Sequence, residues 1–188
     1  MYTTALGIGL SVDSASYIET ARNIKGGRGY VVASPSGLTI PVKHFPAFFP
    51  MLLALPGFLG IDPIVGARWL NAFLLFANTL SVSMIVFVCS GRSFWFSLAA
   101  ALLMLSSESI LTIHAMAWSE PLFIFLAMTG LEFLSMYVVR PNRSFLFASS
   151  LMIALAFFTR YVGAALVLAG LLALLLFDYG ALRRRIKD

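Results

Sequence analysis

The chain has 188 residues, of which 60% are hydrophobic and only 11% are charged, and its mean hydropathy is +0.93. Charged residues make up about a quarter of an ordinary soluble domain, so this composition excludes a soluble fold and predicts an all-α, polytopic membrane protein. The net charge of +5 does not indicate nucleic-acid binding, because the basic residues flank apolar runs, where they act as topology signals and contact anionic lipids. The single cysteine, Cys89, excludes an internal disulfide and a cysteine-cluster metal site.

Residues 1–12 are apolar but too short to cross a membrane, which takes about 20 residues in a helix. They also lack the basic first region of a signal peptide. We therefore expect the end of a first transmembrane helix whose beginning is missing. A wrongly chosen start codon, or a chain cut from a longer one, would give the same pattern.

Residues 13–63 are expected to form a first external loop with amphipathic helices. A helix is predicted over residues 14–25, capped by Asp13 or Ser14 and ended by Gly26-Gly27. At helical spacing its apolar side holds Tyr17, Ile18, Ala21 and Ile24, and its polar side holds Ser16, Glu19, Thr20 and Asn23. Glu19 and Arg22 are close enough to pair weakly. Such a helix would lie flat on the membrane surface.

The rest of this loop is expected to be compact. Residues 29–43 are predicted to form an extended hairpin or loop, with the turn at residues 34–37. Residues 44–60 contain three prolines in eleven positions, which argue against one straight spanning helix. We predict a short interfacial helix there that ends near Gly57.

Residues 64–188 are predicted to form a transmembrane bundle of about five helices with a basic cytoplasmic tail. The expected helical segments are residues 64–90, 94–107, 121–139, 144–158 and 161–177. The second is short and is expected to continue into the following segment. The last two are expected to form a helical hairpin hinged at Thr159-Arg160.

The basic residues give this bundle a predicted orientation. If Arg92, residues 140–143 and residues 183–187 mark the cytoplasmic side, the spans alternate correctly and basic residues are denser inside. One group of polar residues then falls on the external face: Asp13, His44, Glu108, His114, Glu120 and Arg160. Their convergence makes that face the expected place for chemistry.

Each of these residues has a purely structural interpretation as well. Asp13 is either the edge of an active site or only a helix cap. Glu120 follows Ser119, a suitable cap, and is either a site residue or a partner of the helix dipole. Arg160 needs a partner at its depth, which a lipid phosphate would supply, unless its side chain extends to the headgroups.

Neither the two histidines nor Glu132 is expected to take part directly in chemistry. Two histidines without a third ligand at metal spacing make a poor metal site, so His44 and His114 are expected to be structural or interfacial. Glu132 lies inside a predicted span and is expected to be paired within the bundle or near its cytoplasmic end.

An ordered series of motifs resembles one enzyme family. The motif D-x-x-x-Y-x-x-x-A-R-N-x-x-x-G-x-G-Y, from Asp13 to Tyr30, resembles the first external loop of GT-C glycosyltransferases. The later motifs of the series are His44-Phe45-Pro46 to Pro50, Ala67-Arg68-Trp69-Leu70-Asn71, Ser119-Glu120-Pro121-Leu122 and Thr159-Arg160-Tyr161. The branch that the chain most resembles contains the protein O-mannosyltransferases and aminoarabinose transferases.

This resemblance implies transfer of a sugar, with inversion, from a polyprenyl-phosphate donor to a lipid, glycan or protein acceptor. The reaction would take place on the external or periplasmic face of the plasma (inner) membrane. Asp13 would be the catalytic base, and Arg160 and Arg68 would bind the donor phosphate. Glu120, Tyr17 and His44 would line the site or contact the acceptor.

The resemblance also sets expectations about cofactors and length. Many family members carry a second acidic residue directly after the first, whereas Ser14 follows Asp13 here. No metal ligand is therefore assigned, although a divalent cation is compatible with the chemistry. Family members are longer, so we expect these residues to be the N-terminal part of an enzyme and inactive alone.

Two other classes of protein fit the same sequence. One is a transporter or flippase of lipid-linked sugars, and the other is a non-catalytic membrane subunit. Spans broken by Gly or Pro in two matching halves would favour transport, but the prolines near residue 50 have no such counterpart.

Overall fold

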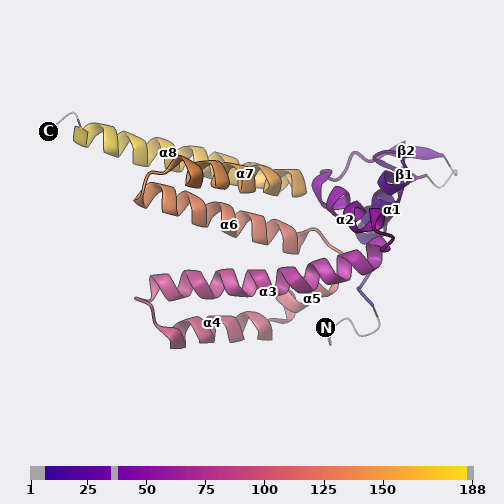
Figure 1. Ribbon diagram of the computed structural model, residues 1–188, viewed down its shortest axis with the longest axis horizontal. Coiled ribbons are helices and arrows are strands. Elements are labelled where there is room, and N and C mark those ends of the chain that lie inside the picture. Colours follow the sequence, from indigo (N-terminus) through magenta and orange to yellow (C-terminus); the bar gives the residue numbers. More distant parts are fainter. Residues whose placement is uncertain (1–6, 35–37, 186–188) are drawn as a thin grey trace.

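The computed structural model describes residues 7–34 and 38–185, and the side chains of this part up to residue 176. Within it are eight α-helices, one short 3-10 helix and a two-stranded hairpin. The elements of the helical bundle are α3 (Pro63–Cys89), α4 (Phe94–Ser106), α5 (Glu108–Ala115), α6 (Glu120–Val139), α7 (Arg143–Thr159), η2 (Tyr161–Gly163) and α8 (Ala164–Arg185). Figure 1 shows the long helices running along one common direction.

The remaining elements gather at one end of this bundle, across the direction of its helices (Figure 1). They are α1 (Val12–Lys25), the strands β1 (Val31–Ala33) and β2 (Thr39–Pro41), and α2 (Phe48–Phe58). We call residues 12–58 the cap, and the end of the bundle that they cover the cap end.

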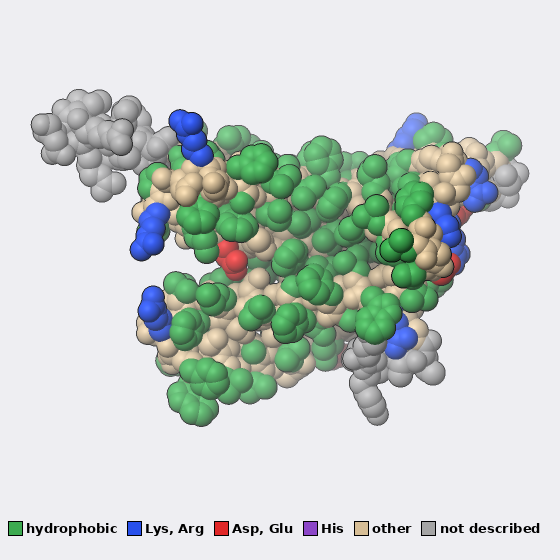
Figure 2. Space-filling view, in the orientation of Figure 1, with side chains coloured by type: hydrophobic (Ala, Val, Ile, Leu, Met, Phe, Trp, Pro, Cys, Tyr) green, Lys and Arg blue, Asp and Glu red, His purple; other side chains and the backbone are tan. Residues whose placement is uncertain are grey.

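Two helices, α3 and α6, are long and apolar enough to cross a membrane. Helices α4 and α5 would form a third span together, although their axes differ by 61° at Ser107. Helix α7 and residues 161–176 are apolar but shorter. In the most apolar 18-residue stretch of each helix, only 11% of the residues of α3 and 22% of those of α6 are buried. Figure 2 shows hydrophobic side chains covering the surface between charged ends. The prediction of a mostly helical protein with apolar helices that could cross a membrane is therefore confirmed, but two or three spans in the described part meet that length, instead of the five or so predicted.

The end of the bundle opposite the cap is basic. Arg92 lies in the connection between α3 and α4, and Arg140 and Arg143 lie where α6 ends and α7 begins. Both connections lie at the same end in Figure 1, away from α1 and α2. We call this the basic end. Arg92 and residues 140–143, which were expected on the cytoplasmic side, thus lie at one end of the bundle, away from the cap.

Residues 7–11 are extended instead of helical. Gly9 pairs with Met116 in a parallel bridge, in which the Gly9 amide donates to the Ala115 carbonyl at 2.7 Å and the Ala117 amide donates to the Gly9 carbonyl at 2.9 Å. A Cβ at Gly9 would meet the Met116 sulfur and lie 3.3 Å from the Ala115 carbonyl oxygen, so glycine allows this close approach without a shift of the Met116 side chain. The expected end of a membrane helix over residues 1–12 is therefore wrong for residues 7–11, and residues 1–6 lie outside the described part.

Helix α1 begins slightly earlier than predicted. Its cap is Ser11, whose hydroxyl accepts a hydrogen bond from the Ser14 amide at 3.3 Å, so neither Asp13 nor Ser14 occupies the cap position. The helix ends at Gly26 as predicted, and Gly27 follows with φ of +71°. Glycine is suited to this left-handed conformation because it has no Cβ.

The predicted polar face of α1 is wrong at two of its four positions. Thr20 and Asn23 are buried, because the cap folds back over them. The Asn23 side-chain amide donates to the Val31 carbonyl at 2.7 Å, and its oxygen accepts from the Arg28 guanidinium at 2.9 Å. Thr20 satisfies its hydroxyl by donating to the Ser16 carbonyl at 2.7 Å.

The predicted pairing of Glu19 with Arg22 is also wrong. Arg22 instead forms a two-pronged ion pair with Asp62, at 2.8 Å for its shortest contact, and Asp62 also caps α3 by accepting from the Ile64 amide. Glu19 accepts from the Ala33 amide of β1 at 2.6 Å. Desolvation acts to raise the pKa of Asp62, but the bonds from Ile64 and Arg22 outweigh it and hold that pKa below its usual value.

The hairpin and the short helix that follows it agree with their predictions in position. Strands β1 and β2 are antiparallel, with Val32 opposite Ile40, and residues 35–37 of the predicted turn lie outside the described part. Helix α2 ends at Phe58, next to the predicted Gly57. The predicted hinge is confirmed as well, since α7 ends at Thr159 and Arg160 is the extended residue that follows.

The main buried core joins the cap to the bundle. Tyr17, Ile18 and Ala21 of α1 pack with Phe49 and Leu53 of α2, and all five are at least 95% buried. The Tyr17 ring lies edge-on to that of Phe49, at 5.1 Å between centroids. The same buried cluster continues into the bundle helices, so it holds α1 and α2 against the end of the bundle.

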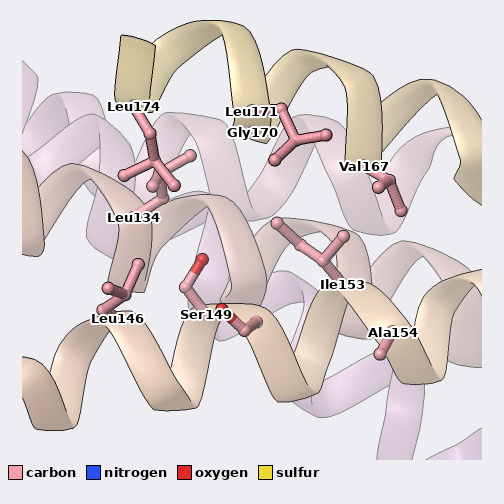
Figure 3. A pocket seen from close by; sticks show the side chains of 10 residues that line it. Leu134, Leu146, Ser149, Ile153, Ala154, Val167, Gly170, Leu171 and Leu174 are labelled. Carbon is pink, nitrogen blue, oxygen red and sulfur yellow. The ribbon is translucent and has the colours of Figure 1, made fainter.

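A cavity lies within the bundle, between α6, α7 and α8 (Figure 3). Its volume is about 190 Å³, and its walls are almost wholly aliphatic. The Ser149 hydroxyl on its wall donates to the Gly130 carbonyl at 2.8 Å, so it offers the cavity little hydrogen-bonding capacity. Ser150 is the other hydroxyl residue among those that line the cavity.

Candidate functional site

Four of the six predicted site residues, Asp13, Tyr17, His44 and Arg160, line a pocket of about 240 Å³ at the cap end, whereas Glu120 and Arg68 do not line it. Asp13 and Tyr17 of α1, residues 44–46 before α2, and residues 159–162 between α7 and α8 line it. Three segments that are distant in sequence thus form one wall each. We call this the Arg160 pocket.

Helix α1 presents Asp13 and Tyr17 to the pocket because residues four apart lie on the same side of a helix. Asp13 is exposed in the first turn, whereas Tyr17 is 96% buried. Burial raises the pKa of Tyr17, although its bond to Ser119 and the charge of Arg160 act to lower it. Tyr17 is therefore a neutral phenol at physiological pH, and Asp13 is the acid that solvent reaches.

Arg160 is held at the break between two helices. Its backbone is extended, and the helix before it ends at Thr159, a buried residue whose hydroxyl donates to the Leu155 carbonyl at 2.7 Å. After it the chain turns tightly, and a Cβ at Gly163 would lie 2.6 Å from the Cα of Phe157. The guanidinium is therefore aimed by the backbone of the break.

The partner of Arg160 is Glu120, which was predicted as a separate site residue. Arg160 Nη1 lies 2.6 Å from Glu120 Oε1 and also donates to the Ser119 hydroxyl at 3.2 Å. About a third of each charged side chain remains exposed. The cation that was expected to bind a lipid phosphate is thus neutralised by a carboxylate, yet stays within reach of a ligand.

Ser119 was predicted only as the cap of α6, but the structure gives it a different role. It occupies the cap position of α6, but its side chain makes no capping bond. The buried hydroxyl instead bonds to Tyr17 at 3.3 Å and to Arg160, so it connects α1 with the hinge after α7. No sequence signal indicates this role, because Tyr17 and Arg160 are far from Ser119 along the chain.

Of the remaining predicted residues, one lies in the pocket and one does not. His44 is exposed and lines the Arg160 pocket. Arg68 is half-buried in the second turn of α3 and does not line it. The structure therefore does not bring the two arginines that were assigned to the donor phosphate together in this pocket.

Two further pockets share walls with this one. A pocket of about 340 Å³ lies between α1 and the hairpin, with Lys43 on its wall, and one of about 460 Å³ lies beside Phe157 and Phe158. The Tyr30 hydroxyl fixes the shared segment by donating to the Phe45 carbonyl at 2.8 Å. Burial raises the pKa of Tyr30 to about 12, so this hydroxyl keeps its proton. The Arg160 pocket is thus bordered by the pocket beside Phe157 and Phe158, which we call the aromatic crevice.

His114 was expected on the external face with this group, but it is buried inside the bundle. Its Nε2 lies 3.1 Å from the side-chain amide nitrogen of Asn78, and its Nδ1 lies 2.7 Å from the Ile110 carbonyl oxygen. Asn78 also donates to the Pro121 carbonyl, so His114 helps to join α3, α5 and α6. The described residues contain no group of three or more His, Cys, Asp or Glu side chains arranged to hold a metal ion.

No protein-family model, curated protein or solved structure matches this chain. The arrangement of the pocket therefore carries the functional argument. It combines a solvent-reachable acid, an arginine whose carboxylate partner is partly exposed, and an aromatic crevice, where the cap meets an apolar bundle.

Proposed function

We propose that the chain is part of a GT-C-type membrane glycosyltransferase, which moves a sugar from a polyprenyl-phosphate donor to an acceptor. The observation that carries the proposal is that Asp13 and Arg160 line the same pocket at one end of an apolar bundle. Helices α3 to α8 form the membrane domain in this proposal, and the cap end faces the external side of the plasma membrane. The residue motifs described above support the same class of enzyme.

Arg160 would bind the phosphate of the carrier. A guanidinium binds two phosphate oxygens at once with parallel hydrogen bonds, and Arg160 is anchored with part of its surface free. Glu120 neutralises the guanidinium, so an incoming phosphate would share or replace that carboxylate. As the sugar departs, the phosphate gains charge, and the same contact stabilises it.

Asp13 would act as the general base toward the acceptor. Its carboxylate would take the proton of the acceptor hydroxyl while the acceptor oxygen forms a bond to the anomeric carbon. The bond between that carbon and the phosphate oxygen breaks, and the phosphate leaves on the carrier with the electron pair. One displacement of this kind inverts the anomeric configuration.

The crevice beside the pocket suits the lipid part of the donor. Phe157, Phe158 and Tyr161 line it, and Phe158 and Tyr161 are each 55% exposed. Aromatic side chains at such a position give the first isoprenoid units an apolar surface. The carrier would then continue into the bilayer along α7.

The proposal is tested by sugar transfer in membranes that contain the protein and a radiolabelled polyprenyl-phosphate sugar. Asp13→Asn should lower turnover roughly a hundredfold or more and change donor affinity little, because it removes the base. Arg160→Ala should raise the donor KM, with a smaller loss of turnover at saturating donor. Glu19→Gln is the matched control, since it lies on α1 outside the Arg160 pocket and its amide oxygen can still accept from Ala33.

Near-normal turnover of folded Asp13→Asn protein would contradict the proposal. Asp13 would then be only a first-turn residue of α1 that favours the positive end of the helix dipole.

A further inference from the structure

Glu132 is an acidic residue in the apolar part of α6, and the proposed reaction does not use it. It lies about 10 Å before the end of the helix, given a rise of 1.5 Å per residue. The surrounding window of α6 is apolar enough to cross a membrane. An ionisable side chain at this depth is costly unless something compensates it.

The carboxylate is not satisfied within the described part of the chain. Its oxygen Oε1 is shielded from solvent and has no hydrogen-bond partner there. Neither of the two ion pairs among the described residues includes Glu132. Hydroxyl groups elsewhere in the bundle do find partners, as Thr79 and Ser83 do with carbonyls of their own helix.

Glu132 points away from α7 and α8. Gly130 packs against Ile153 of α7, and Leu134 lines the cavity between α7 and α8. Successive residues of a helix are turned by about 100°, so a residue midway between these two faces the opposite side. That side of α6 faces α3 near the cap end, where Asn78 bonds to Pro121.

Towards the basic end, the two groups of helices separate. Figure 1 shows α6 diverging from α3 and α4 there, and Figure 2 shows a notch between the two groups, with acidic atoms on its wall. The face of α6 that carries Glu132 therefore lacks the close neighbour that covers its first turn.

We propose that this face of α6 is the docking site of a transmembrane helix from another protein, which presents a lysine or arginine side chain to Glu132. Charge complementarity decides the chemistry of the partner, because a cation at the same depth gives the carboxylate both a counter-charge and a donor. A second copy of this chain in the same orientation does not offer one at that depth: Arg68 lies in the second turn of α3, at the cap end, Arg143 begins α7, and residues 183–185 are the last of α8. The inference is independent of the proposed transfer reaction.

The test uses the purified protein in phosphatidylcholine vesicles, with a fluorophore on Cys89, which is exposed at the end of α3. The probe is a synthetic transmembrane peptide of leucine and alanine with one central lysine, and energy transfer reports its association. The lysine peptide should bind roughly tenfold more tightly than the same peptide with leucine at that position. Glu132→Leu should remove this preference, and Glu132→Gln should reduce it.

Glu108→Gln is the control, because it neutralises an exposed acid at the start of α5 and should leave the preference unchanged. Circular dichroism and gel filtration establish that each variant remains folded. Equal binding of the two peptides to the wild-type protein would overturn the proposal. A preference that survives in folded Glu132→Leu protein would overturn it as well.

Discussion

At the scale of single residues, the charge state of the Arg160 pocket depends on a competition. Glu120 lies 2.6 Å from the guanidinium that the proposed donor phosphate needs, and both side chains are about one-third exposed. An ion pair of this exposure contributes only about 0–1 kcal/mol, so the singly charged phosphodiester of the donor can compete with the carboxylate, and the leaving phosphate monoester, with up to two negative charges, can displace it. The Ser119 hydroxyl also accepts from Arg160, at 3.2 Å, and gives the guanidinium a second anchor besides Glu120.

Glu120→Gln should therefore tighten phosphate binding, by up to about fivefold, since it removes the competing charge. Dodecyl phosphate is a suitable ligand, and isothermal titration calorimetry at low and high salt measures its Kd. Glu108→Gln serves as the control for a general change in net charge. Weaker binding by the Glu120 variant would show that Glu120 aims Arg160 instead of competing for it.

At the scale of elements, the hinge between α7 and α8 depends on one glycine. A Cβ at Gly163 would lie 2.6 Å from the Cα and 2.7 Å from the amide nitrogen of Phe157. Both are backbone atoms, so the turn itself must shift, and overpacking of this kind costs about 1–3 kcal/mol. Because Arg160 begins this turn, the shift would also move its guanidinium.

Gly163→Ala should therefore lower thermal stability in detergent and weaken dodecyl phosphate binding. Gly170→Ala is the matched control in α8, where the new Cβ would lie 3.6 Å from Ile153 Cδ1 in ordinary contact. Equal melting temperatures and Kd values for the two variants would contradict this account of the hinge.

The start of α3 depends on Asp62, which both caps the helix and pairs with Arg22. Asp62→Ala should destabilise the protein by about 1 kcal/mol, because it removes the capping bond as well as the ion pair. Asp62→Asn keeps a capping oxygen and should cost only about 0.5 kcal/mol, since an exposed pair contributes little. Chemical denaturation of the purified protein measures both differences.

The pH dependence of this cap follows from the lowered pKa of Asp62. A carboxylate whose pKa is lower in the folded state stabilises the protein above its unfolded pKa, near 3.8, and that contribution is lost as the pH falls through the folded value. The stability difference between wild type and Asp62→Asn should therefore shrink as the pH is lowered below about 3.8. A difference that grows on acidification would contradict this assignment.

At the scale of the whole molecule, the cap end and the basic end should lie on opposite sides of the membrane. In a Cys89→Ser background, Ala15→Cys should react with an impermeant reagent from outside, and Arg92→Cys only after the membrane is opened. Both positions are exposed and lie at opposite ends of the bundle. Reaction of both from the same side would refute the orientation that the basic residues predict.

The sequence by itself determined the class of the protein and most of its helices. The ends of α2 and α6, the continuation of α4 into α5 and the hinge at Thr159-Arg160 follow from hydropathy and from Gly, Pro and polar residues nearby, whereas the 61° bend between α4 and α5 was not predicted. These signals are local, because a helix boundary depends on residues within about one turn. The alternation of the predicted spans also placed Asp13 and Glu120 at the same end of the bundle, the cap end.

Which side chains come into contact depends on the tertiary structure and could not be predicted from the sequence. Tyr17 and Ser119 are 102 residues apart, Ser11 and Trp118 are 107 apart, and each pair is joined by a hydrogen bond. The burial of Asn23, the exclusion of Arg68 from the pocket and the extended backbone at Gly9 likewise depend on segments that arrive from elsewhere in the chain. A periodic pattern shows which face of a helix is apolar, but polar groups such as Asn23 are buried wherever folding brings them a partner, and one sequence does not encode that partner locally.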